Sequence, residues 1–259
     1  MFFVKILITL VLVILLTEIS KRVRPAVGGI LMGLPLGAGL STFFLAYEQG
    51  IPFLLQAIPW GILGLSSSLL FALSYYLADR FFPHPLRLVS ALRSSLVAIL
   101  AYGVASMGLR LLPLRLGIAL PVTLGTIFLN FLAVRWIIPP SIKPPKTHTS
   151  LSLILLRGMV TAVTIASLTG MARIIGPAWS GILSAFPIVL FQVLVFLHVE
   201  EGPKVYPGVI TGFSYSVINL LLFYLLLALL LPVAGLNLTY MIVYLFSMVF
   251  LYLLNRVRH

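Results

Sequence analysis

The segment from Pro25 to Gly50 occurs a second time in this chain, and this repeat constrains the fold more than any other feature. The second copy lies 152 residues later, from Pro177 to Gly202, and aligns with the first without a gap. Leucine and isoleucine matches carry little weight in so apolar a sequence. The informative matches are two pairs of prolines, two pairs of glycines and one pair of glutamates: Pro25 with Pro177, Pro35 with Pro187, Gly29 with Gly181, Gly50 with Gly202 and Glu48 with Glu200.

The apolar composition of the chain requires a membrane. Hydrophobic residues make up 61% of the 259 positions and charged residues only 8%, whereas a soluble domain carries about 25% charged residues. We therefore expect an integral membrane protein with the lipid bilayer as its surroundings. The net charge of +12 would suggest nucleic acid as the partner of a soluble protein. Here the basic residues stand at the ends of apolar runs, as membrane orientation requires, so we expect no nucleic-acid binding.

The apolar runs predict an all-α fold, a polytopic membrane helix bundle of about nine spans. A spanning helix needs about 20 apolar residues. Residues 88 to 138 are too long for one span, so we expect a tight turn between Arg110 and Arg115. The predicted spans are Phe2–Ile19, Ala26–Tyr47, Pro52–Ala78, Leu88–Leu112, Leu114–Ile138, Leu151–Ala172, Ala178–Val199, Val205–Leu231 and Leu236–Asn255.

A Pro-rich segment divides these spans into two groups. Residues 1–140 hold a first membrane repeat of five spans, of which Leu88–Leu112 looks like an insert, and residues 151–259 hold a second repeat of four spans. Residues 141–150 between them form a linker that should be extended and solvated, because proline stiffens a chain. The first apolar run has no small-residue cleavage site after it, so we expect a retained span and not a signal peptide.

Basic residues are distributed unevenly between the two sides of the predicted spans. Thirteen Lys and Arg residues fall on the side of the C-terminus and four on the other side. Cytoplasmic loops carry the excess of basic residues, so we expect the N-terminus outside and the C-terminus inside. Five spans separate the starts of the two copies, and this odd number turns the second copy upside down. Such inverted repeats are characteristic of secondary transporters, although a duplication without a transport role stays open.

Matching prolines and glycines interrupt the second and seventh spans. Pro35 and Pro187 each remove a backbone hydrogen bond from a helix, and the carbonyl group freed in this way must face protein or a wet cavity. Interrupted segments at matching positions of two halves are the best sequence indication of a transporter binding site. Gly29 and Gly181 accompany the prolines as candidates. The alternative is helix packing, because small residues let membrane helices approach closely.

Two carboxylates stand at the ends of the same spans. Glu48 and Glu200 face the negative end of the helix dipole, which is unfavourable by a few tenths of a kcal/mol. Their placement suggests a coupling role for a proton or cation, exerted as equivalent gates on opposite faces. The alternative is that both are solvated at the interface, with the following glycine as a helix cap.

Other polar residues give weaker indications. Gln192 and Asn219 lie within predicted spans and either line a polar path or hydrogen-bond between helices. His198 has no polar match in the first copy, where Ala46 stands, and a single histidine is more often structural. The chain has five acidic residues and no cysteine, and no P-loop or catalytic triad pattern. We therefore expect no enzyme activity, no catalytic residues, no metal and no cofactor.

The repeated pattern resembles the GlpM-like family of small bacterial inner-membrane proteins. The residues that carry the resemblance are Gly29, Pro35, Glu48 and Gly50, and the spacing recurs in the second copy. Members of this family are single units of about four spans. The resemblance implies a helical fold in a bacterial or archaeal cytoplasmic membrane. It implies little about function, since the family is linked only loosely to exopolysaccharide production.

These observations support two hypotheses about function. The first is a small secondary transporter or exporter, in which an unknown small solute or ion passes between the second and seventh spans. The second is an accessory membrane protein of envelope or exopolysaccharide assembly that transports nothing. A polar cavity beside both prolines favours the first hypothesis, and tight packing there favours the second. The sequence leaves formation of a homo-oligomer open.

Overall fold

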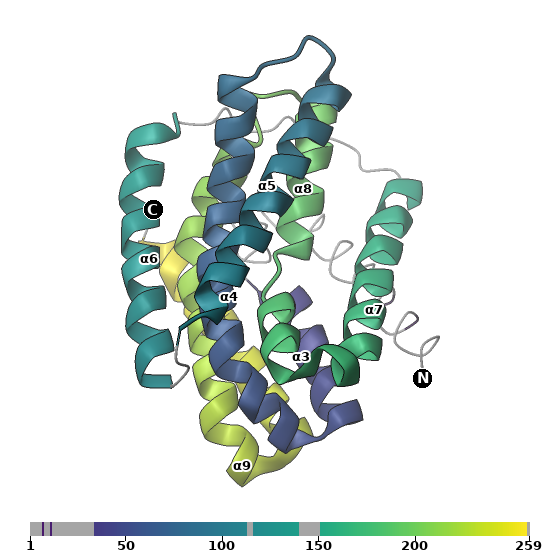
Figure 1. Ribbon diagram of the computed structural model, residues 1–259, viewed down its shortest axis with the longest axis vertical. Helices are drawn as coiled ribbons and strands as arrows, with labels where there is room; N and C mark the ends of the chain where they lie inside the picture. The colour runs from purple at the N-terminus through teal and green to yellow at the C-terminus, as the bar shows by residue number, and fades with distance from the viewer. Residues whose placement is uncertain (1–6, 8–10, 12–33, 113–115, 140–150, 258–259) are drawn as a thin grey trace.

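The computed structural model describes residues 7, 11, 34–112, 116–139 and 151–257. Every regular element in this part of the chain is a helix, which confirms the predicted all-α class (Figure 1). The first predicted span, most of the segment before Pro35, and the Pro-rich linker lie outside the described residues. The helices are α3 (Leu36–Gln49), α4 (Ile51–Phe81), α5 (Arg87–Arg110), α6 (Leu116–Ile137), α7 (Leu151–Ser184), α8 (Ile188–Glu200) and α9 (Pro207–Val257).

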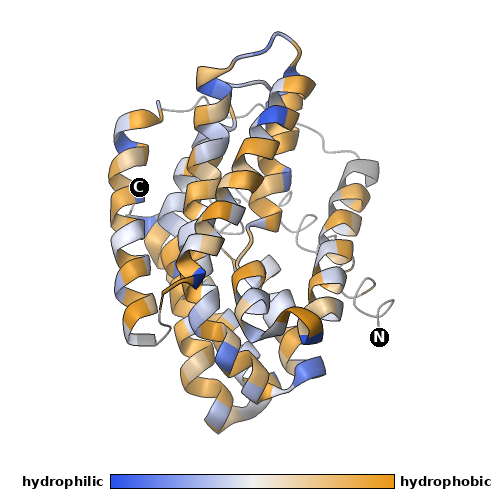
Figure 2. Cartoon of the chain, in the orientation of Figure 1, coloured by the Kyte–Doolittle hydropathy of each residue, from blue (hydrophilic) through white to orange (hydrophobic). Residues whose placement is uncertain are grey.

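Five of the described helices are long and apolar enough to cross a membrane: α4, α5, α6, α7 and α9. Figure 2 shows long apolar stretches along these helices, with hydrophilic residues where the loop joins α4 to α5. Large apolar side chains such as Leu96, Phe128 and Val249 are about 60% exposed. In water such surfaces would aggregate, whereas in a bilayer they face lipid. The protein is therefore an integral membrane protein with several spans.

Helix α4 forms the centre of the bundle, because it packs against α3, α5, α6, α7 and α9. Its side chains Leu63, Phe71 and Tyr75 are completely buried. Gly64 lies so close to α7 that an added Cβ would come within 2.9 Å of the Ile182 carbonyl oxygen. Small residues allow such close contacts between helices in lipid, where van der Waals packing drives association.

Kinks at two glycines divide the longest helices. A straight helix of the 51 residues of α9 would be about 76 Å long, far more than the ~30 Å hydrocarbon core of a bilayer. Gly235 (φ 68°, ψ −178°) is not helical, and α9 reverses direction there (Figure 1). Gly176 (φ 74°, ψ 175°) divides α7 in the same way. The kink at Gly235 falls at the predicted boundary between the eighth and ninth spans.

The seventh predicted span, Ala178–Val199, is interrupted at Pro187, as the sequence predicted. The chain is helical up to Ser184 in α7, breaks before Pro187 and resumes as α8. The break exists because proline offers no amide hydrogen to continue the helix. Likewise, the described part of the second predicted span becomes helical only after Pro35. The predicted division of residues 88 to 138 does appear, since α5 ends at Arg110 and α6 begins at Leu116.

The two copies of the repeat share their backbone geometry at the matched residues. Pro35 (φ −75°, ψ 51°) and Pro187 (φ −81°, ψ 64°) each form an inverse γ-turn. In both turns the amide of the residue after the proline donates to the carbonyl oxygen of the residue before it, at 2.8 Å. Gly50 and Gly202 have φ values of 90° and 89°. From their prolines, α3 and α8 run in opposite directions (Figure 1).

Candidate functional site

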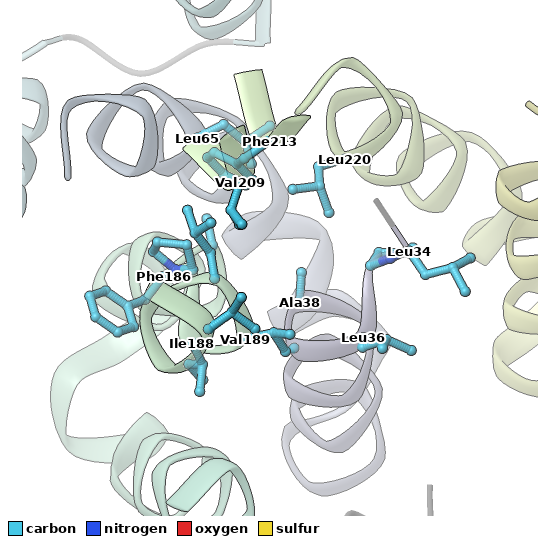
Figure 3. Close-up of a pocket in the computed structure, with 16 residues that line it drawn as sticks. Leu34, Leu36, Ala38, Leu65, Phe186, Ile188, Val189, Val209, Phe213 and Leu220 are labelled. Atoms are coloured by element: carbon cyan, nitrogen blue, oxygen red, sulfur yellow. The ribbon is translucent and has the colours of Figure 1, made fainter. Parts of the chain in front are cut away.

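The two proline breaks meet at one cavity of about 60 Å³. Leu34 to Ala38 form one wall and Ala185 to Leu190 form the wall opposite, as Figure 3 shows for the first turns of α3 and α8. Helices α4 and α9 complete the enclosure with Leu65, Val209, Phe213 and Leu220. A volume of this size holds a few water molecules or a small solute group. Residues 152 positions apart in the sequence thus line a single site.

Hydroxyl groups from neighbouring helices donate to carbonyl oxygens at the two breaks. The Ser68 hydroxyl donates to the Ala185 carbonyl oxygen at 2.6 Å, and Tyr102 donates to the Ile182 carbonyl oxygen at 2.7 Å. On the other side of the cavity, the Tyr244 hydroxyl donates to the Pro35 carbonyl oxygen at 3.3 Å. The Ile182 and Pro35 carbonyl oxygens also accept from the backbone amides of Ala185 and Gly39. An unsatisfied carbonyl in lipid would cost several kcal/mol, so Ser68 supplies the partner that the Ala185 carbonyl needs.

The side chains that line this cavity are all apolar. The first turn of a helix leaves amide hydrogens without partners in the same helix, and the first turns of α3 and α8 both border the cavity. The polar groups that the lining residues offer are therefore backbone groups. The cavity lies beside both prolines, but the side chains that line it are not polar.

Glu48 and Glu200, the predicted gates, lie at opposite ends of the described bundle. Glu48 is half-buried and lines a second cavity of about 430 Å³ with Thr169 and Arg173. Arg173 Nε donates to the neighbouring Gln49 side chain at 3.3 Å. The Glu200 side chain is exposed, and its main-chain oxygen accepts a hydrogen bond from Arg87 Nη1 at 2.8 Å. The two carboxylates therefore cannot share one proton.

The remaining predicted site residues do not line the cavity between the breaks. A Cβ added at Gly181 would clash with the Ala57 carbonyl oxygen of α4, so this glycine serves helix packing. Gln192 Nε2 donates to Thr161 Oγ1 of α7 at 3.0 Å. Asn219 is completely buried within α9, and Gly29 lies outside the described residues. Of the eight predicted residues, Pro35 and Pro187 are at the cavity.

A second site, missed by the sequence analysis, surrounds Asp79 near the end of α4. Asp79 Oδ1 accepts a hydrogen bond from the Ser90 hydroxyl at 2.6 Å and lies 3.3 Å from His198 Nε2. Asp79 Oδ2 accepts a hydrogen bond from the Tyr206 hydroxyl at 2.7 Å. The Tyr75 hydroxyl lies 3.1 Å from His198 Nδ1. The carboxylate thus joins α4, α5, α8 and the start of α9.

This Asp79 cluster is well shielded from solvent. The His198 side chain is 1% exposed and the Asp79 side chain 11% exposed. The imidazole ring stacks on the Tyr206 ring, with 4.7 Å between the ring centres. Two features of the sequence could have indicated this cluster. Asp79 is the single aspartate of the chain, and His198 stands where the first copy of the repeat has the apolar residue Ala46. Neither signal shows that residues 119 positions apart are in contact.

No family model, no curated protein and no solved structure matches this chain. The resemblance to GlpM-like proteins therefore stays a prediction. The function has to be inferred from the protein's own geometry. That geometry offers a cavity between two helix breaks and the Asp79 cluster at one end of the bundle.

Proposed function

We propose that this protein is a small secondary transporter or exporter of a bacterial or archaeal cytoplasmic membrane. The observation that carries the proposal is the meeting of both proline breaks at one cavity. Discontinuous helices that begin at a central site between two repeats are typical of secondary transporters.

The two halves are proposed to be inverted relative to each other. The supporting observation is that α3 and α8 begin at the same cavity and end at opposite ends of the bundle. The exposed basic residues Arg80, Arg87 and Lys204 gather where α4 and α8 end, and this end is proposed to be cytoplasmic. In this arrangement the N-terminus is outside, the C-terminus is inside, and the full chain has about nine spans.

In the proposed cycle, α3 and α8 move alternately about the breaks at Pro35 and Pro187. Movement of α3 opens the cavity toward the end that holds Glu48, and movement of α8 opens it toward the end that holds Glu200. The two carboxylates stand at the two mouths and contribute charge there. The solute is small, and within the cavity it contacts backbone groups and apolar side chains.

The second candidate is an accessory protein of envelope or exopolysaccharide assembly that transports nothing. The observation that favours it is the small size and apolar lining of the cavity, since an apolar cavity can stay dry. In that case the breaks would serve packing, as Gly181 does. The two candidates differ in whether water and solutes reach the cavity from both faces of the membrane.

Cysteine accessibility distinguishes these candidates without knowledge of the solute. The chain contains no cysteine, so Val189→Cys introduces a single thiol into the cavity wall. A charged, membrane-impermeant methanethiosulfonate reagent would then be applied to right-side-out and inside-out vesicles. Alternating access predicts that the thiol reacts from both faces. Reaction from one face or from neither contradicts the transporter proposal.

Three matched variants control this experiment. Leu63→Cys places the thiol in the packed centre of α4, where the side chain is completely buried, and it should not react from either face. Tyr47→Cys and Lys204→Cys place it at exposed positions at the two ends of the bundle, and each should react from one face. If Leu63→Cys reacted as fast as Val189→Cys, general unfolding would explain both.

A further inference from the structure

We propose that Asp79 and His198 form a proton-binding site, so that H⁺ is the ion coupled to solute movement. The site itself rests on the contacts of the Asp79 cluster. Its coupling to a solute rests on the proposed transport function.

The hydrogen bonds around His198 can accommodate one additional proton. In the neutral ring, Nε2–H donates to Asp79 Oδ1 at 3.3 Å and Nδ1 accepts from the Tyr75 hydroxyl at 3.1 Å. A hydronium ion transfers its proton to Nδ1 and leaves as water, so one O–H bond breaks as the N–H bond forms, and both ring nitrogens then become donors. The Tyr75 hydroxyl oxygen changes from donor to acceptor. The imidazole is the side chain that ordinarily exchanges protons between about pH 5 and pH 8.

The charge of the cluster changes from −1 to zero when this proton binds. Asp79 is an ionised carboxylate with hydrogen bonds from Ser90 and Tyr206, and a neutral imidazole leaves its charge uncompensated. A protonated imidazole compensates it within a largely buried site, where charge interactions are strong. Among the other groups near this end of α8, Tyr75 and Tyr206 contact the imidazole. Arg87 donates to the main-chain oxygen of Glu200. The side chains of Glu200 and Lys204 are exposed, and that of Glu201 is half-buried.

The Asp79 cluster connects three of the elements that enclose the cavity between the breaks. His198 lies ten residues, or about 15 Å, along α8 from Ile188 in the cavity wall. Asp79 lies 14 residues, or about 21 Å, along α4 from Leu65 in the same wall. Tyr206 immediately precedes α9, which contributes Val209. A protonated pair holds α8 against α4, and loss of the proton weakens this contact and releases α8.

This proton site occurs at one end of the molecule only, among the described residues. At the repeat spacing of 152 residues, Ala46 corresponds to His198 and Leu231 corresponds to Asp79. The end with Glu48 therefore has no equivalent pair. Control by protons is thus restricted to the end with Arg87 and Lys204, which is the end proposed to be cytoplasmic.

Distance measurements between spin labels test the proton site without a solute. Phe82→Cys and Lys204→Cys place labels at exposed positions after α4 and after α8. We expect their separation to increase by about 2 Å or more between pH 5 and pH 8, the scale of a helix shift. The matched control pair, Tyr47→Cys with Ile174→Cys, lies at the opposite end and should not change. An unchanged separation of the first pair would overturn the proposal.

Three substitutions identify the groups responsible. His198→Gln keeps an amide beside Asp79 but cannot take up the proton, and Asp79→Asn removes the compensating charge. Both should abolish the pH-dependent change of separation. Tyr206→Phe removes one hydrogen bond to the Asp79 carboxylate and keeps the pair of Asp79 and His198. This variant should retain the pH-dependent change of separation. It tests whether loss of a single contact to Asp79 is enough to abolish that change. If the change persists in His198→Gln, or disappears in Tyr206→Phe, the pair is not the proton site.

The labels and the accessibility of Val189→Cys separate the two proposals. A pH-dependent separation without access of reagent from both faces would leave the proton site standing and remove its role in transport. Access from both faces without a pH-dependent separation would leave transport standing and exclude this proton site. A direct check is the imidazole NMR signal of His198 in a chain with His84, His148 and His259 replaced by Gln. That signal should change over the same pH range as the separation.

Discussion

At the scale of single residues, Gly181 shows how little space separates α7 from α4. A Cβ at this position would overlap the Ala57 carbonyl oxygen, a backbone atom that cannot move aside without shifting α4. We expect Gly181→Ala to lower the free energy of unfolding by about 1–3 kcal/mol, the usual cost of overpacking. Thermal unfolding in detergent measures this. Gly125→Ala in α6, where no atom lies within 4 Å, is the matched control and should be neutral or slightly stabilising. Equal effects at both positions would exclude the packing explanation.

The hydroxyl of Ser68 is a second single group whose removal should lower stability. It donates to the Ala185 carbonyl oxygen, which the break before Pro187 leaves without a helical partner. Ser68→Ala should destabilise the protein by about 1–3 kcal/mol, because a buried carbonyl loses its donor. Ser216→Ala removes a buried hydroxyl that donates within its own helix to Phe213, and it should cost less. Chemical denaturation of both variants in detergent compares them, and a larger loss for Ser216→Ala would contradict the assigned role of Ser68.

The sequence was informative about single residues where the backbone chemistry is local. Pro35 and Pro187 were predicted to interrupt helices because proline lacks an amide hydrogen. Pro187 does separate α7 from α8, and α3 begins directly after Pro35, whose preceding span lies mostly outside the described residues. Asp79 was not predicted, because its importance depends on His198, Ser90 and Tyr206, which come from other elements. A contact between residues far apart in the chain leaves no periodic pattern in one sequence. The sequence left two roles open for Gly181, lining a substrate path or allowing close helix packing. The close approach to Ala57 assigns Gly181 to helix packing.

At the scale of elements, Gly50 allows α4 to begin directly where α3 ends. Its φ of 90° lies in a region that side chains with a Cβ rarely adopt. We expect Gly50→Ala to cost about 1–2 kcal/mol of stability through backbone strain. Gly103→Ala in α5, which has helical geometry and no atom within 4 Å, should not. Thermal unfolding of the two variants under the same detergent conditions gives the comparison, and a stable Gly50→Ala variant would show that the turn can rearrange.

Helix boundaries were predictable where glycine, proline or arginine marks them. The turn after Arg110 and the kink at Gly235 fall where the sequence placed the ends of spans. The interruption of the seventh span was predicted from Pro187, but hydropathy is uniform across Ala185 and Phe186 and does not reveal at which residue the chain leaves the helix. The break leaves the Ala185 carbonyl oxygen without a helical partner, and its partner Ser68 comes from α4, 117 residues away in the sequence.

At the scale of the whole molecule, the repeat connects the sequence to the proposed mechanism. Two segments 152 residues apart form the same inverse γ-turn at a proline and the same positive φ at a glycine. Their helices then diverge from one cavity (Figures 1 and 3). The departure from this symmetry is as informative as the symmetry itself, since Asp79 of the first half and His198 of the second half meet at one end of the bundle and have no equivalent pair at the other described end. A molecule of this design would have equivalent gates, with a proton bound beside only one of them.

The orientation of the two halves relative to each other in the membrane can be tested on the entire chain. Tyr47 and Lys204 are exposed residues beside Gly50 and Gly202, the matched ends of the two copies. If the copies are inverted, Tyr47→Cys should react with an impermeant maleimide in intact cells, and Lys204→Cys should react only in inside-out vesicles. The basic residues Arg80 and Arg87 lie at the same end as Lys204, and an excess of basic residues favours the cytoplasmic face. A chain with Phe82→Cys as its single cysteine is the control. Phe82 follows α4 at the same end of the bundle as Lys204, so Phe82→Cys must label from the same face as Lys204→Cys. Labelling of Tyr47→Cys and Lys204→Cys from one common face would exclude inverted halves, and a path between them would then lose its structural basis.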